Sequence, residues 1–449
     1  MKFSYKQQIV ITLLLSLIQF LIALSMYLLN TEDILWPLFC TTSFLTLAFN
    51  IGMANRNPIS SLYSIGVLLY YFQLPFIKFF PNTPVSVYNL NYQDHITFEF
   101  YLIYSFILSI QILITLYFSQ LFKDYNTFII KIINSSNLGG FSKLNIIIAC
   151  LTLTITIYQN GGIINYLVLN KFEATEASRF LGFFTWKDFA VIGITTFVLS
   201  KSKNWLFTLL IISLITVEIL TAKRLLLLIT AASIYLTHMK TFKFQSFLYC
   251  SIAILFLNLI KYTYYSLQNI FTNKVADTEI FWFQWSDFFR DSLLTSEFSA
   301  HLRLTYLYLS HDISLPISDF FNQFFAAIPL SGTILQIDYL TAGERLRVML
   351  NEPWSGLASS MYTSSFLSLG ILGIILMYLI FVIYITFLYT ISKKFNLIGI
   401  LFISLSPYLF FYLQREEFLL AAQHTYVYSA ILIFMFWALK LPKIKFLKK

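Results

Sequence analysis

Apolar stretches of about 20 residues recur along almost the whole chain, and a helix of that length crosses roughly 30 Å of hydrocarbon. Because a bilayer admits only helices or closed barrels, we expect an all-α polytopic integral membrane protein, with residues 1–449 as a single transmembrane domain. The expected spans, about twelve by apolar length, are 9–29, 33–53, 59–79, 98–121, 142–158, 186–200, 204–221, 223–238, 246–266, 361–389, 396–414 and 424–440.

Composition agrees with this class, since 58% of the residues are hydrophobic and only 11% are charged. These values exclude a soluble globular protein and predict membrane lipids, with no nucleic acid, as surroundings. The first apolar stretch lacks a small-residue cleavage site, so we expect it to remain as a span.

Lysine sets the expected orientation. Lysines gather at both termini and in alternate loops, for example at Lys123, Lys201, Lys240 and Lys393, where acidic residues are almost absent. Because cytoplasmic loops collect positive charge, both termini are predicted to be cytoplasmic.

Arginine follows a different distribution. Only eight of the 30 basic residues are arginine, and Arg56 alone is predicted to be cytoplasmic. The other seven are predicted at the outer face: Arg179, Arg224, Arg290, Arg303, Arg345, Arg347 and Arg415. The planar guanidinium binds phosphate and carboxylate oxygens through two parallel hydrogen bonds, which an ammonium cannot do. This pattern favours an outer anion site suited to a lipid-borne diphosphate; the alternative is that each arginine pairs with a local acid or extends to lipid head groups.

Two outer segments are long enough to carry such a site. Segment 159–185 begins with a glycine pair followed by "IINYLVL", which we expect to form a short interfacial helix. Segment 267–360 is a large, partly helical outer loop, with helical periodicity over 287–312 and a second helix near Gly343.

The second loop contains "DYLTAGERLRVMLNEPWSG" (338–356), the densest charge in the chain. On a helix, Arg345 and Arg347 lie on different faces, so at most one of them meets a substrate directly. Glu344 is a candidate for orienting a neighbour or acting as a base, and a pairing with Arg347 is an equal alternative.

Acid–base candidates are few. His301 lies on the face expected to carry Arg290, and an outer imidazole is able to accept a proton from a hydroxyl; a histidine that only hydrogen-bonds within its loop is the alternative. Glu218 with Lys223 and Arg224, and "REE" at 415–417, place further charges near the expected outer boundary. No metal-ligand spacing and no nucleotide-binding motif occurs, so we expect no metal and no cofactor.

The expected spans, the outer segment that opens with "GGIINYL", the long outer loop and "GLASSMYTSSFLSLGILGII" together resemble the Wzy-type O-antigen polymerases. Arg345 followed by Gly356 is similar to that family's loop pattern of an arginine and a later glycine. The resemblance covers most of the chain as architecture, but its motifs are short and degenerate.

The resemblance implies a GT-C-type glycosyltransferase of the bacterial inner membrane, with the 267–360 loop in the periplasm. It would transfer a growing glycan from undecaprenyl diphosphate to the next undecaprenyl-diphosphate-linked repeat, without a metal and with a possible chain-length regulator as partner. The outer arginines would bind diphosphate, and Glu344 or His301 would serve as the base.

Other functions fit part of the pattern. Related O-antigen ligases place a histidine ahead of the span that follows the large loop, where this chain has "WSGLASSMY". A flippase for lipid-linked sugars also suits twelve spans, but its charges are expected in a cavity open to both sides. A scaffold that only binds lipid-linked glycan is a third possibility.

Overall fold

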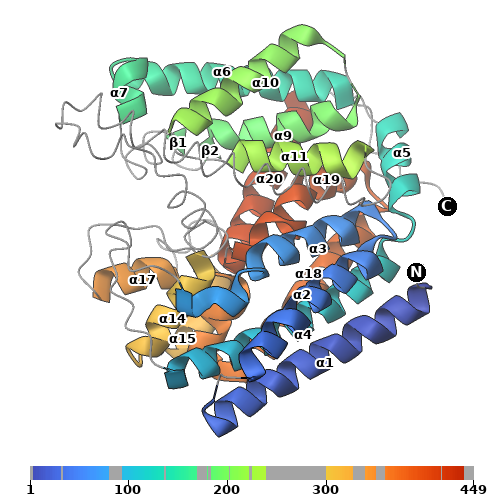
Figure 1. Ribbon diagram of the computed structural model, residues 1–449. Helices are drawn as coiled ribbons and strands as arrows, with labels where there is room; N and C mark the ends of the chain where they lie inside the picture. Colours follow the sequence, from blue (N-terminus) through green and yellow to red (C-terminus); the bar gives the residue numbers. More distant parts are fainter. Residues whose placement is uncertain are drawn as a thin grey trace, which may run out of the picture. The chain divides into compact units, whose positions relative to one another are not determined.

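The residues that the structure describes are almost entirely α-helical in the computed structural model (Figure 1). The structure describes residues 4–31, 34–79, 94–135, 138–168, 179–180, 184–201, 203–221, 225–238, 300–326, 339–349, 359–415 and 417–438. The chain packs as two compact units. Unit 1 comprises Met1–Tyr125, Phe289–Phe387 and Tyr408–Gln423, and unit 2 comprises Asn126–Phe288, Leu388–Pro407 and His424–Lys449.

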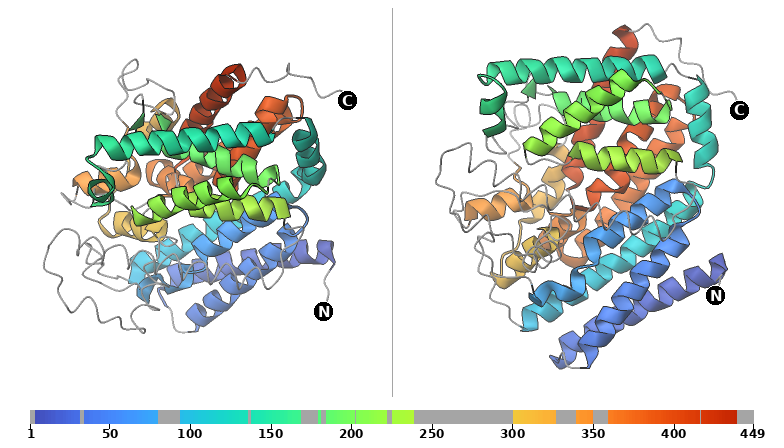
Figure 2. Two further views of the ribbon diagram at one scale, coloured as in Figure 1. Left: turned by 90° about the horizontal axis from the view of Figure 1, so that it is seen from above. Right: turned by 45° about the horizontal axis from the view of Figure 1, so that its top comes forward.

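Unit 1 contains the first four long helices and three short helices from the large loop. Its elements are α1 (Tyr5–Leu29), α2 (Leu35–Ala54), α3 (Pro58–Tyr71), η1 (Leu74–Phe79), α4 (Asp94–Leu121), α14 (Ala300–Ser310), α15 (Ile317–Ala326), α17 (Ala342–Met349), most of α18 (Met361–Ser392), η4 (Tyr412–Arg415) and the start of α20 (Phe418–Ala438). Helix α1 packs on α2 and α4, and α14 packs on α4 (Figures 1 and 2).

Unit 2 is built around α6, which packs along α9 (Figure 2). Its elements are α5 (Tyr125–Ser135), α6 (Leu138–Gln159), α7 (Ile163–Val168), β1 (Arg179–Phe180), β2 (Phe184–Thr185), α9 (Trp186–Leu199), α10 (Trp205–Leu220), α11 (Leu225–His238), most of α19 (Asn396–Phe410) and the remainder of α20. The two short strands are antiparallel, with Arg179 opposite Thr185. Helix α7 occupies the "IINYLVL" stretch for which a short helix was expected.

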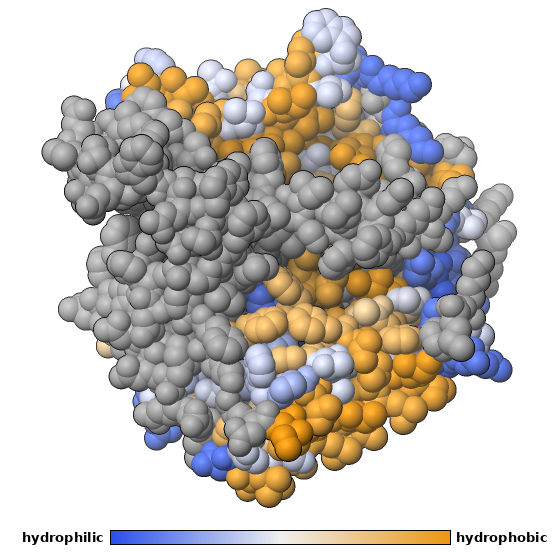
Figure 3. Space-filling view, in the orientation of Figure 1, coloured by the Kyte–Doolittle hydropathy of each residue, from blue (hydrophilic) through white to orange (hydrophobic). Residues whose placement is uncertain are grey.

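Helix α1 shows the polarity that a bilayer imposes. A capping box between Ser4 and Gln7 starts the helix. Small and polar side chains face the protein, whereas leucines such as Leu14 and Leu17 are exposed. Figure 3 shows apolar side chains over the surface of the lowermost helices. Hydroxyl pairs join the helices, as between Ser16 and Ser109 of α4 at 2.8 Å. This pattern is typical of membrane helices, because lipid tails match exposed leucine while polar contacts join neighbouring helices.

Six helices among the described residues are long and apolar enough to cross a membrane: Tyr5–Leu29, Leu35–Ala54, Pro58–Ile77, Ile96–Leu121, Leu138–Gln159 and Met361–Ser392. The all-α membrane class is therefore supported by the structure. The other predicted spans that the structure describes are also helical, and α10 and α11 are separate helices. The apolar helices at 205–220, 225–237 and 396–410 are shorter than the six candidate spans. The predicted span 246–266 lies outside the described residues. A total of twelve spans stays a prediction.

Helix α18 is sharply broken at Gly370, whose φ of 62° and ψ of −148° are not helical. Glycine suits this position because it has no Cβ to clash at positive φ. The break removes a helical partner from the carbonyl of Leu367, and the backbone N–H of Leu315 donates to that oxygen at 2.9 Å. The break therefore ties the start of α18 to the segment that leads into α15.

Gly373, just after the break, is expected to tolerate no side chain. A Cβ on Gly373 would overlap the backbone oxygen of Ser365. Gly373→Ala should lower the free energy of unfolding by at least about 1–3 kcal/mol, the usual cost of overpacking, because backbone must move. Thermal unfolding in detergent measures the effect. Gly139→Ala is the matched control, since a Cβ on Gly139 of α6 would meet nothing within 4 Å. Equal unfolding temperatures for the two variants would contradict the close packing at Gly373.

Candidate functional site

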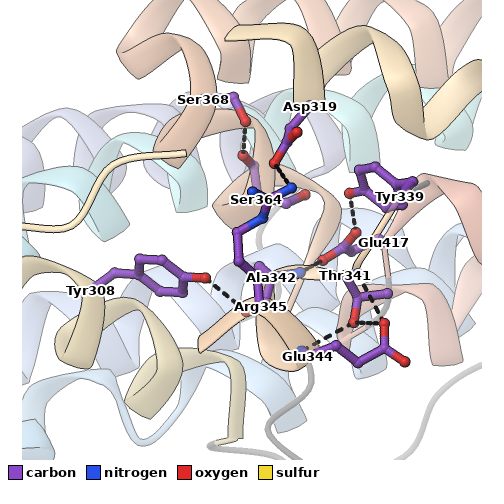
Figure 4. Close-up of polar contacts among 10 residues, drawn as sticks. All are labelled: Tyr308, Asp319, Tyr339, Thr341, Ala342, Glu344, Arg345, Ser364, Ser368 and Glu417. Atoms are coloured by element: carbon purple, nitrogen blue, oxygen red, sulfur yellow. Dashed lines mark hydrogen bonds and ion pairs between the residues drawn. The ribbon is translucent and has the colours of Figure 1, made fainter. Parts of the chain in front are cut away.

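The charged stretch 338–356 forms its predicted helix, α17, and Glu344 caps it. Both the backbone N–H and the hydroxyl of Thr341 donate to Glu344 Oε2, at 2.9 and 2.8 Å. The Glu344 N–H donates back to the Thr341 hydroxyl at 3.3 Å (Figure 4). This is the capping box of the sequence Thr-Ala-Gly-Glu, which satisfies N–H groups that a first turn leaves unpaired. Glu344 thus has a structural role whatever else it does.

A buried carboxylate, Glu417, holds the segment that carries α17. Its Oε2 accepts from the Tyr339 hydroxyl at 2.5 Å, and its Oε1 accepts from the Ala342 N–H at 2.7 Å and the Ser359 hydroxyl at 3.0 Å. Tyr339 and Ala342 lie before most of α17 (Figure 4), and Ser359 follows the 338–356 stretch in the sequence. One side chain therefore joins the two ends of the 343–358 segment, next to the first residue of α20.

Two tyrosines complete this anchor. Tyr308 of α14 donates to the carbonyl of Ala342 at 2.7 Å. Burial, with the charge of Glu417 as a further cause, raises the pKa of both Tyr308 and Tyr339 well above the ordinary value. Both phenols therefore keep their protons at neutral pH and remain hydrogen-bond donors. The result is a fixed position for α17 relative to α14.

Arg345 is the arginine whose geometry is most informative. Its Nη2 lies 2.6 Å from Oδ2 of Asp319 on α15, and the Asp319 side chain is 7% exposed while that of Arg345 is 26% exposed. Figure 4 shows the ion pair between the guanidinium and Asp319. Arg345 Nε is buried and has no hydrogen-bond partner among the described residues. A guanidinium has five N–H donors, so Asp319 orients Arg345 without using all of them.

The charge balance of this pair depends on burial. Burial raises the pKa of Asp319 above its ordinary value, and the guanidinium of Arg345 opposes that rise. A carboxylate in this environment needs its cation, so the pair orients both side chains. The pair agrees with the alternative weighed from the sequence, in which an arginine binds a local acid.

The remaining predicted residues are described unevenly. Arg303 is on α14 and half-buried, and His301, two residues earlier and on a different face of the helix, is completely buried. The His301 ring packs among Tyr70, Tyr71 and Tyr104, with ring centroids 5.4–6.0 Å apart. Three residues have a described backbone but no described side chain: Arg179, Arg347 and Arg415. Two lie outside the described residues: Arg224 and Arg290. A gathering of all seven arginines therefore stays a prediction.

Unit 2 has a charge cluster of its own. Lys187 Nζ lies 3.3 Å from Oε1 of the buried Glu218, whose Oε2 accepts the Leu226 N–H at 2.6 Å. His424 Nδ1 lies 3.7 Å from Asp188, which also caps α9. The sequence indicated Glu218, but it proposed Lys223 and Arg224 as partners, and these lie outside the described residues.

Sequence reasoning missed Asp319 and gave Glu417 only a general place near the outer boundary. The signal for Asp319 was its position in "ISDFFNQFFA", where one acid interrupts an aromatic pattern. Asp319 and Arg345 are 26 positions apart in the sequence, so their pairing becomes visible only in the structure.

The chain matches no family model, no curated protein and no solved structure.

Proposed function

We propose that this protein polymerises lipid-linked oligosaccharide repeats at the periplasmic face of the bacterial inner membrane. The growing glycan leaves undecaprenyl diphosphate and joins the next undecaprenyl-diphosphate-linked repeat. The observation that carries the proposal is Arg345: a partly exposed guanidinium, oriented by Asp319, on a helix that Glu417 anchors beside the start of α20, which overlaps the predicted span 424–440. A fixed fork at that position is suited to phosphate oxygens that are attached to a lipid tail.

In the proposed reaction, an acceptor hydroxyl attacks the anomeric carbon of the growing glycan. The bond from that carbon to the phosphate oxygen breaks, and undecaprenyl diphosphate leaves with the bonding electrons. Arg345 contributes hydrogen bonds and positive charge to the leaving diphosphate, whose charge grows in the transition state. Positively charged neighbours on the same loop, Arg303 and Arg347, are proposed to assist it.

The hydroxyl proton needs an acceptor within hydrogen-bond reach of the substrate. Of the two predicted candidates, Glu344 fits better. Its capping contacts with Thr341 use Oε2, its side chain is only half-buried, and it is adjacent to Arg345 in the sequence. His301 is completely buried, which gives a sugar hydroxyl no route to its ring in this conformation.

The direct test supplies the purified protein, in detergent and in a parallel sample reconstituted in vesicles, with undecaprenyl-diphosphate-linked repeats, lipid A core as the alternative acceptor and no nucleotide. We expect a ladder of glycans that differ by one repeat, resolved by gel electrophoresis or mass spectrometry. Transfer of glycan to lipid A core instead of to another repeat would favour an O-antigen ligase. Absence of both products, with movement of the lipid-linked repeat across vesicles, would favour a flippase. Either outcome would overturn the polymerase proposal.

A further inference from the structure

Helix α15 is amphipathic in an unusual way, because its apolar side is only partly covered by protein. Ile317, Phe321 and Phe325 recur every four residues and are 62%, 51% and 49% exposed. Asp319 and Gln323, on the opposite side of the helix, are buried. Large exposed apolar residues in a single stripe indicate a contact surface, since scattered ones would need no explanation.

Neighbouring contacts indicate what covers this stripe. The Leu315 N–H, just before α15, bonds to the Leu367 carbonyl of α18 at 2.9 Å. Phe324 packs on Phe418, the first residue of α20, with ring centroids 5.5 Å apart. Helix α15 is thus fastened at both ends to helices that are predicted spans.

The exposed side chains of α18 indicate that lipid covers the stripe on α15. Immediately beyond the break at Gly370, Ile371, Leu372 and Ile375 are exposed on a candidate membrane span. Exposed aliphatic residues on such a helix face lipid. Helix α15 belongs to the same unit as this part of α18, and Leu315 links the start of α15 to α18. The position of the stripe therefore favours lipid as its occupant.

We infer that α15 is an interfacial helix, with Ile317, Phe321 and Phe325 in the outer leaflet. Asp319, on the other side of the helix, then holds Arg345 near the lipid head groups. A helix of this kind lies in the membrane plane with its apolar face among the acyl chains. A lipid-linked anion that diffuses in that leaflet then reaches Arg345 from the side. The membrane contact does not rest on the proposed transfer reaction, but the role for a lipid-linked anion does.

The contact is tested with single nitroxide labels in vesicles of phosphatidylethanolamine and phosphatidylglycerol. Cys40, Cys150 and Cys250 are first replaced by alanine, and cysteine is then introduced by Phe321→Cys, Phe325→Cys or, as the matched control, Asn322→Cys. Asn322 is half-buried on the same helix and, one residue after Phe321, lies about 100° around the helix from it, toward the side of Asp319 and Gln323. We expect labels at 321 and 325 to collide more with oxygen, which concentrates in lipid, and the label at 322 to collide more with a water-soluble nickel complex.

Two results would overturn the inference. Equal nickel accessibility at 321 and 322 would place the stripe in water, and shielding of 321 from both reagents would show that protein covers it. A second measurement connects the stripe to Arg345. Phe321→Gln should increase trypsin cleavage after Arg345 in vesicles, whereas Asn322→Gln should leave it unchanged. Neither readout requires activity. The membrane contact can therefore be refuted while polymerisation is observed, and it can be confirmed while polymerisation is absent.

Discussion

Replacing Arg345 by lysine is expected to reduce the initial rate of glycan lengthening by about 100-fold or more, the usual effect of removing one donor aimed at developing charge. Lysine keeps the positive charge but loses the planar fork. The Arg345 guanidinium contacts Asp319 through Nη2 and has other nitrogens in the same plane to present to a diphosphate, whereas the donors of a lysine ammonium all leave one nitrogen and cannot form that two-nitrogen fork. The measurement is the rate at which purified protein extends undecaprenyl-diphosphate-linked repeats.

The matched control is Arg56→Lys, which makes the same chemical change away from α17. Arg56 follows α2, and its guanidinium lies 3.2 Å from the centre of the Tyr5 ring. We expect this variant to extend glycan at the normal rate. If Arg345→Lys did the same at equal protein level, Arg345 would have no part in the reaction, and the observation that carries the proposed function would be lost.

Replacing Glu417 by alanine is expected to release the 343–358 segment from its anchor. Three donors would lose a buried, charged acceptor, and each hydrogen bond to a charged group contributes about 1.5–3 kcal/mol. Local unfolding would expose Arg345 and Arg347 to trypsin, so cleavage at these two residues should become several-fold faster. Mass spectrometry of the fragments identifies the cut sites.

Single-contact variants calibrate that result. Ser359→Ala removes one of the three donors to Glu417, and Glu344→Gln weakens only the cap of α17, which is worth about 1 kcal/mol. Both should increase cleavage less than Glu417→Ala does. Cleavage in Glu417→Ala at the wild-type rate would show that this carboxylate does not join the two ends of the segment.

Local pattern was sufficient to locate many of the helices. The apolar length of 9–29 and 98–121 predicted α1 and α4, since spanning helices need no distant partner to be recognised. Charge and periodicity also predicted a helix near Gly343, which is α17. The sequence did not predict α15 or the break at Gly370, and the hydrogen bond between Leu315 and Leu367 that connects the two regions joins residues far apart in the chain.

The chemical roles were harder to predict than the helices. Glu344 was a candidate base from its position beside two arginines, yet the structure uses it first as the cap of α17. His301 was placed on a loop helix as expected, but packing among three tyrosines buries it. A residue's chemical type is visible in sequence, whereas its accessibility depends on what packs against it.

The sequence by itself determined that this chain is an all-α membrane protein with its densest charge on a short helix outside the spans, because hydrophobic length and charge placement are local properties. Only the tertiary structure decided that Asp319 orients Arg345 and that Glu417 joins both ends of the loop. Those partners lie 26 or more residues apart in the chain. Ion pairs and buried hydrogen bonds form over about 3 Å, so folding has to bring such groups together before either role exists.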